Sequence, residues 1–185
     1  ALLVTFSADY QVFQVLLVWL GIFTIFFGKG ARTPLILLTI YGFAISFPLF
    51  ILRFAENAYA RTIIIPLERI LNVLGYNFAA EGQRLNLISS SGDSISVVIT
   101  GGCAGPATMG VFLAIFALMM LDMPLPPKKA AWLLLFGVAG TWFQNLIRTS
   151  ILMTTGYYLG EKAMWAVHYW SGYIMFPLWY LFFAC

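Results

Sequence analysis

The chain of 185 residues is 62% hydrophobic and 9% charged, and its formal net charge is +3. Soluble domains are about 45–50% apolar and about 25% charged, so a water-soluble core of this size would not bury so many apolar side chains. The small, scattered positive charge also argues against nucleic acid as a partner. The composition therefore predicts a single integral membrane domain over residues 1–185.

Five hydrophobic stretches are long enough to cross a hydrocarbon core, at residues 10–28, 34–52, 104–121, 130–152 and 163–184. A core of about 30 Å needs about twenty helical residues. We therefore expect an all-α polytopic membrane protein with five to six membrane helices. The first stretch has no basic segment before it, so we do not interpret it as a signal peptide. The chain begins with Ala1 rather than Met, which is compatible with a trimmed start and with further spans upstream.

Basic residues between the stretches predict the orientation of the chain. Lys29 and Arg32 lie between the first two stretches, and Lys128 and Lys129 lie between the third and fourth. By the positive-inside rule both short loops are cytoplasmic. The two loops share a side only if residues 53–102 lie outside, with the amino terminus outside and the carboxyl terminus inside.

The extracytoplasmic segment, residues 53–102, begins with a pattern typical of an amphipathic helix over residues 57–74. Its apolar stripe contains Ile63, Ile64, Leu67, Ile70, Leu71 and Leu74. We expect Pro66 to kink or interrupt this helix. The stripe predicts an interfacial helix on the outer leaflet. A short membrane span is the alternative, against which the charges at Glu56, Arg61, Glu68 and Arg69 argue.

A short β-hairpin is expected next in the same segment. Residues 84–88 and 94–99 alternate apolar and polar side chains, and the Ser-Ser-Gly-Asp sequence at 90–93 is typical of a turn. The second strand leads directly into the sequence Thr-Gly-Gly-Cys that ends at Cys103.

Cys103 lies directly before the third stretch and among glycines. Gly101, Gly102 and Gly105 permit unusual backbone angles, and Pro106 suits the first turn of a helix. We therefore expect Cys103 at or near a helix N-terminus on the extracytoplasmic side. The N–H groups there favour a thiolate and would hold an oxyanion, which makes Cys103 a candidate nucleophile. The alternative is that Cys103 is only a small hydrophobic residue.

Two further ionisable residues return to the same face of the membrane. Arg148 comes about nineteen residues after Lys129, near the outer end of the fourth stretch. The chain then turns around residues 156–161, which places His168 roughly 10 Å along the returning helix. Ionisable groups at membrane depth usually have a partner or a task. Arginines that reach the headgroups and histidines with a structural role are the alternatives.

Other residues near these three, or of the same type, also need an interpretation. Asn145 lies three residues before Arg148 on the same helical face, where it would orient the guanidinium or bind a substrate carbonyl. A hydrogen bond between helices explains Asn145 equally well. Cys185 ends the last stretch on the other side of the membrane, so we expect no disulfide with Cys103. Aromatic residues around His168 suggest interfacial anchors: Trp165, Tyr169, Trp170 and Tyr173.

Three short blocks, in this order and spacing, resemble the exosortase/archaeosortase family of membrane transpeptidases. They are Gly-Gly-Cys-Ala-Gly at 101–105, Asn-Leu-Ile-Arg at 145–148, and His-Tyr-Trp-Ser-Gly at 168–172 with Phe176 after it. The resemblance covers about residues 70–176, and the first two stretches contribute little. Ala104 replaces a serine that is common in the family, and Pro106 replaces an aliphatic residue; neither change removes a group that the chemistry needs.

The resemblance implies a cysteine transpeptidase or protease without a metal or cofactor. Its partners would be secreted proteins with a C-terminal sorting signal, and a membrane lipid is the implied amine acceptor in archaeal members. The implied catalytic residues are Cys103, Arg148 and His168, with Asn145, Gly102 and Gly105 in support. Arg148 would stabilise the oxyanion and His168 would move the proton. The reverse division of roles stays open, because the third position of the family also holds arginine.

Two other functions remain open from the sequence. A non-catalytic membrane scaffold or transporter subunit would explain the stretches and the aromatic residues. It would not explain a glycine-flanked cysteine on the same face as an arginine and a histidine. A simple hydrolytic protease, with water as the acceptor, would use the same residues as a transpeptidase.

Overall fold

The computed structural model describes residues 11–76, 78–100, 103 and 105–184. The helices are α1 (Gln11–Phe27), α2 (Arg32–Phe54), α3 (Glu56–Val73), α4 (Pro106–Asp122) and α5 (Pro127–Ala184), with a 3-10 helix, η3 (Gly28–Ala31), between the first two. Three strands, β1 (Phe78–Glu81), β2 (Arg84–Ile88) and β3 (Ser94–Val98), lie between α3 and α4 in the chain. The protein is therefore mostly helical, with one small sheet.

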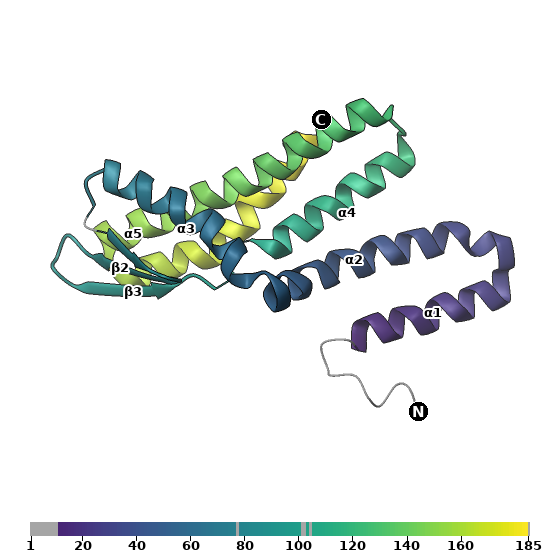
Figure 1. Ribbon diagram of the computed structural model, residues 1–185, viewed down its shortest axis with the longest axis horizontal. Helices are drawn as coiled ribbons and strands as arrows, with labels where there is room; N and C mark the ends of the chain where they lie inside the picture. The colour runs from purple at the N-terminus through teal and green to yellow at the C-terminus, as the bar shows by residue number, and fades with distance from the viewer. Residues whose placement is uncertain (1–10, 77, 101–102, 104, 185) are drawn as a thin grey trace.

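The long helix α5 consists of two helices that meet at Gly160. The backbone of Gly160 is non-helical, with φ 81° and ψ 177°, a conformation that glycine adopts without steric cost. Figure 1 shows the first part of α5 running toward the sheet and the second part returning beside it. The turn lies inside the range 156–161 that the sequence predicts. It brings residues on either side of Gly160 face to face.

Two helical stretches of the described residues are long and apolar enough to cross a membrane, Leu17–Phe54 and Pro127–Ala184. α4 is also apolar but shorter, at 17 residues. Each longer stretch folds back on itself, the first through η3 and the second at Gly160. Many large apolar side chains on these stretches are exposed, as expected for a surface that meets lipid. The five to six membrane helices expected from the sequence stay a prediction.

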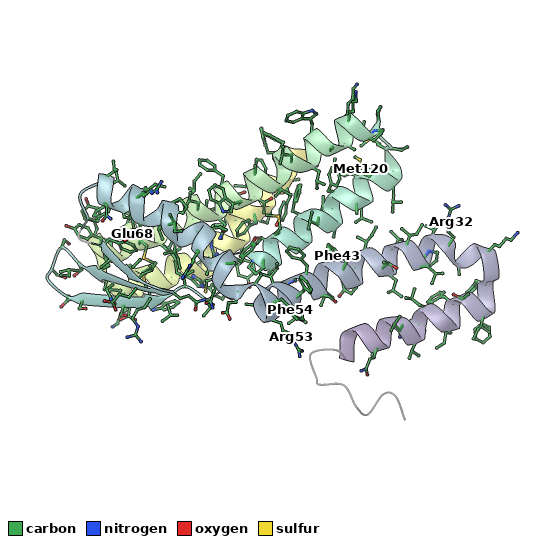
Figure 2. All side chains as sticks on the ribbon, in the orientation of Figure 1. Arg32, Phe43, Arg53, Phe54, Glu68 and Met120 are labelled. Carbon is green, nitrogen blue, oxygen red and sulfur yellow. The ribbon has the colours of Figure 1, made fainter. Side chains whose placement is uncertain are left out.

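The two basic turns lie at the end of the molecule away from the sheet. Figure 1 shows the α1–α2 turn and the α4–α5 turn at that end, whereas α3 and the strands occupy the other. Arg32, beside the first turn, and Glu68, on α3, lie far apart in Figure 2. This arrangement agrees with the positive-inside argument that both basic turns share one side of a membrane.

Small residues allow the helices to pack closely. A side chain at Gly110 of α4 would place its Cβ 2.7 Å from the carbonyl oxygen of Ala44 on α2. At Gly137 of α5, a Cβ would lie 2.0 Å from the ring of Phe112. Phe112 is fully buried and packs against Phe183, with ring centroids 4.9 Å apart. Glycine at these positions therefore permits the close contacts by which membrane helices associate.

The amphipathic helix forms as α3, but its apolar stripe faces protein. Ile63, Ile64, Leu67 and Leu71 are buried in one core with the sheet and α5. Ile70 and Leu74 are 38% and 60% exposed, so these two members of the predicted stripe are not buried. The predicted stripe faces protein rather than lipid, because the sheet and α5 cover it, and the position of α3 on the outer leaflet stays a prediction. α3 also continues through Pro66, so the proline does not interrupt the helix.

The predicted hairpin is confirmed as β2 and β3, but it belongs to a three-stranded antiparallel sheet with the order β1-β2-β3. Leu85 lies opposite Val97, and Leu87 lies opposite Ile95, so these side chains share the core-facing side. β1 is missing from the sequence-based description because Phe-Ala-Ala-Glu contains no β-branched residue. It forms by pairing with β2.

Hydrogen bonds fix the sheet on the helices. The backbone N–H and the hydroxyl of Ser90 donate to the carbonyl oxygen of Tyr157, at 3.0 and 3.1 Å. The side-chain amide of Gln83 donates to Oδ1 of Asn57 on α3, at 2.9 Å. The sheet is therefore held at the tip of α5, close to Gly160, and the chain leaves β3 toward Cys103.

Candidate active site

Cys103 lies on a short turn between β3 and α4. Its backbone N–H donates to the carbonyl oxygen of Thr100, at 3.0 Å, and the Thr100 hydroxyl donates to its Sγ, at 3.5 Å. The side chain is half-buried. Cys103 comes two residues before Gly105, the N-cap of α4, so it lies just before the helix rather than in its first turn. Gly101, Gly102, Ala104 and Cys185 are outside the described residues, and the expectations for Gly102 and Cys185 stay predictions.

Gly105 and Asn145 pack directly against each other beside this turn. Gly105 has φ 95°, in the left-handed region that glycine tolerates best. A Cβ at Gly105 would lie 2.9 Å from both Cγ and Nδ2 of Asn145. Asn145 is 2% exposed, and its backbone carbonyl oxygen accepts a hydrogen bond from the Thr149 hydroxyl. The buried amide of Asn145 therefore packs against the N-cap of α4, and both roles expected for this residue stay predictions.

Gly105→Ala is expected to destabilise the turn that carries Cys103. The left-handed backbone costs an alanine about 1–3 kcal/mol, and the new methyl group collides with Asn145. Gly92→Ala is the matched control, because Gly92 has φ 89° but open space around it. Thermal unfolding in detergent should show a larger loss of Tm for Gly105→Ala. Equal losses would mean that the contact with Asn145 contributes nothing.

Arg148 is held by groups from the returning part of α5. Its Nε donates to Oγ of Ser171, at 2.9 Å, and its Nη2 donates to the carbonyl oxygen of His168, at 3.1 Å. The guanidinium carbon lies 5.8 Å from the centre of the Phe176 ring, within the range of a cation–π contact. Among the residues that the structure describes, two of the five N–H donors of Arg148 are engaged, which leaves three for other acceptors.

Cys103, Arg148 and His168 line the same cavity, which has a volume of about 30 Å³. Its other walls are the end of β3, including Val98, and side chains of both parts of α5, including Leu152 and Trp165. The imidazole of His168 packs edge-on against Trp165, with ring centroids 5.4 Å apart. The fold thus brings together a thiol, a guanidinium and an imidazole from three separate parts of the chain.

The positive charge of Arg148 has neutral partners. Within the part of the chain that the structure describes, Arg148 makes no ion pair with a carboxylate, and its two acceptors are a hydroxyl and a carbonyl. Arg148 is also the only charged residue in the sequence between Lys129 and Glu161. A cation at membrane depth is costly unless a counter-charge or a polar group stabilises it. The cavity is therefore suited to an anion beside Cys103.

Ser171 and Thr100 are polar residues of the site to which the sequence assigns no role. Ser171 lies inside the block 168–172, one helical turn after His168, so its spacing places both residues on one face. Thr100 lies three residues before Cys103, but only the turn shows that its hydroxyl reaches the sulfur. Neither residue is ionisable, and a search for titratable groups therefore passes over both.

Ser171→Ala is expected to lower the activity of the site by about tenfold, because a hydrogen bond to a charged group is lost. Ser171 acts through Arg148 as a positioning residue, so Ser171→Thr, which keeps a hydroxyl, should restore most of the loss. The measurement is the processing rate of a substrate protein, with kcat and KM determined separately. A full loss in both variants would indicate a packing defect instead.

The fold and the cavity define a membrane protein with a cysteine, an arginine and a histidine gathered at the end that carries the sheet. The chain belongs to the transmembrane exosortase family, whose model matches residues 1–185. The match includes α1 and α2, and so extends beyond the range 70–176 of the sequence blocks. No curated protein and no solved structure matches the chain.

Proposed function

We propose that this protein is a multi-pass cysteine transpeptidase of the cell membrane. It cleaves the C-terminal sorting signal of secreted proteins and transfers the new carboxyl end to an amine, with a membrane lipid as the candidate acceptor. The observation that carries the proposal is the cavity shared by Cys103, Arg148 and His168. Membership of the transmembrane exosortase family supports the substrate class.

The reaction would proceed through a thioester on Cys103. His168 takes the thiol proton, and the sulfur attacks the scissile carbonyl carbon. The carbonyl oxygen becomes an oxyanion, which the remaining N–H donors of Arg148 stabilise. The C–N bond then breaks, and the leaving amine receives the proton from His168. In the reverse division of roles, Arg148 supplies this proton.

The second half of the reaction restores the enzyme. The acceptor amine attacks the thioester carbonyl, an amide bond forms and the C–S bond breaks. The proton lost by the amine returns through His168 to the sulfur of Cys103. Water in place of the amine would give a free carboxylate, which is the hydrolytic alternative.

The position of the cavity agrees with catalysis on the extracytoplasmic side of the membrane. The cavity lies at the sheet end of the molecule, and the basic turns lie at the other end. By the positive-inside rule the turns face the cytoplasm, so the cavity faces the secreted substrate. The cavity has room for roughly one or two water molecules, so a peptide must bind along its mouth.

The test is the mass of the new carboxyl end of a secreted reporter. The reporter carries the C-terminal tail of a secreted protein from the same organism, with a short motif, an apolar span and basic residues. Cells that express this protein should convert the reporter to a product whose mass includes an amine. A free acid would indicate a hydrolytic protease. No conversion of any such tail would contradict the proposal and favour the scaffold.

A further inference from the structure

The outer edge of β3 carries unused backbone hydrogen-bonding groups. β3 is an edge strand, because the sheet order is β1-β2-β3. The N–H of Ile99 donates to the carbonyl oxygen of Gln83, and the N–H of Ser89 donates to the carbonyl oxygen of Asp93. The backbone N–H and C=O groups of the odd-numbered residues of β3 therefore point toward β2. Hydrogen-bonded pairs alternate along an antiparallel ladder. The N–H and C=O groups of Ser94, Ser96 and Val98 therefore point away from the sheet.

These outward groups are accessible. Ser94, Ser96 and Val98 are exposed, and no hydrogen bond within the described part of the chain occupies their outward backbone groups. Figure 1 shows β3 at the side of the sheet away from α3, whereas β1 packs next to α3. Natural edge strands usually carry a proline or a charged side chain such as lysine, which prevents pairing with a further strand. The sequence of β3, Ser-Ile-Ser-Val-Val, has none of these.

The same edge runs into the candidate active site. Val97, Val98 and Ile99 line the cavity that Cys103, Arg148 and His168 share. From the end of β3 the chain reaches Cys103 within five residues, through the turn that Thr100 closes. A strand paired with β3 would lie about 4.8 Å from it. Such a strand would therefore lead its backbone to the mouth of the cavity.

We infer that β3 binds the substrate by strand addition: an extended peptide segment, next to the scissile bond of the secreted protein, pairs with its outer edge. This inference rests on the proposed function and names how its substrate is held. Main-chain pairing supplies binding that is independent of side-chain identity, while contacts at the cavity supply selectivity. The pairing also fixes the scissile carbonyl with respect to Cys103 and Arg148, which a cavity of about 30 Å³ cannot do by enclosure.

Proline substitution tests the pairing, because proline removes one backbone N–H and is tolerated on an open strand edge. Ser96→Pro removes an outward N–H of β3 and should lower the rate of reporter processing about tenfold, chiefly through KM. The loss should exceed that of Ser96→Ala, which keeps the N–H. Ala80→Pro is the matched control: its N–H points away from β2 on the opposite edge of the sheet, so processing should be retained. Equal processing by wild type and Ser96→Pro would overturn the inference.

A second measurement uses the wild-type protein and does not depend on the folding of a variant. In a synthetic peptide that spans the cleavage site of the processed reporter, each residue in turn is N-methylated. Pairing with β3 predicts that the cleavage rate decreases when every second residue on one side of the scissile bond is methylated. Methylation of the residues between them should leave the rate unchanged. A loss without this period of two would overturn strand addition even if Ser96→Pro fails to fold.

The controls separate the two proposals. If wild type does not process the reporter, or if a variant without the Cys103 thiol processes it equally well, the proposed function fails. If the Cys103 thiol is required, but Ser96→Pro processes the reporter like wild type or N-methylation shows no period of two, only strand addition fails.

Discussion

Cys103→Ala should leave the reporter in its precursor form, with a processing rate reduced at least about 10³-fold. The thiol is the only nucleophile of the cavity that can form a thioester, and no other cysteine lies in the described part of the chain. Removal of Sγ costs one hydrogen bond from Thr100, so the fold should survive. The measurements are gel mobility of the reporter, the mass of its carboxyl end and the Tm of the variant.

Two further variants make this result specific. Cys103→Ser keeps the shape of the side chain but replaces the thiol by a much weaker nucleophile, and should also accumulate precursor. Cys185→Ala removes the other cysteine of the sequence and should process the reporter normally. If a folded Cys103→Ala variant converts the reporter at the wild-type rate, the cysteine mechanism is wrong and the scaffold interpretation takes its place.

Arg148→Lys should lose activity about 10²–10³-fold, the usual cost of a lost oxyanion donor. Lysine keeps the charge but has no planar fork, and it cannot contact Ser171 and the His168 carbonyl while it points another donor at the substrate. The loss should appear mainly in kcat, because the contact with the oxyanion forms only in the transition state.

Lys162→Gln is the control for charge, since Lys162 is an exposed cation elsewhere on α5. Its processing rate should equal that of wild type. Full activity of Arg148→Lys would show that a point charge is sufficient, and the geometry of the guanidinium would then have no role. An unchanged kcat with a raised KM would assign Arg148 to substrate binding alone.

The membrane character and the main helices follow from the sequence. The stretches 34–52, 104–121, 130–152 and 163–184 fall on α2, α4 and the two parts of α5, because hydropathy along one chain reports directly on lipid contact. The hairpin of β2 and β3 is also predictable, since alternation of side chains is a local property. Local sequence thus determines which segments are helices and strands.

The partners of these segments are decided by tertiary structure. The apolar stripe of residues 57–74 would suit contact with lipid or with protein. Only the packing against the sheet and α5 shows that protein covers it. β1 has a weak strand sequence and forms because β2 offers a paired edge. Burial and pairing depend on the neighbour, which the pattern of one segment does not specify.

The candidate site divides in the same way. Glycines around Cys103, a lone charge at Arg148 and a lone imidazole at His168 mark these residues in the sequence, and their catalytic roles stay predictions. Only the tertiary structure shows the hydrogen bond from Arg148 to Ser171 and the unpaired edge of β3 beside the cavity. The turn at Gly160 sets which face of the returning helix meets Arg148, and that rotation results from packing between helices rather than from residue spacing.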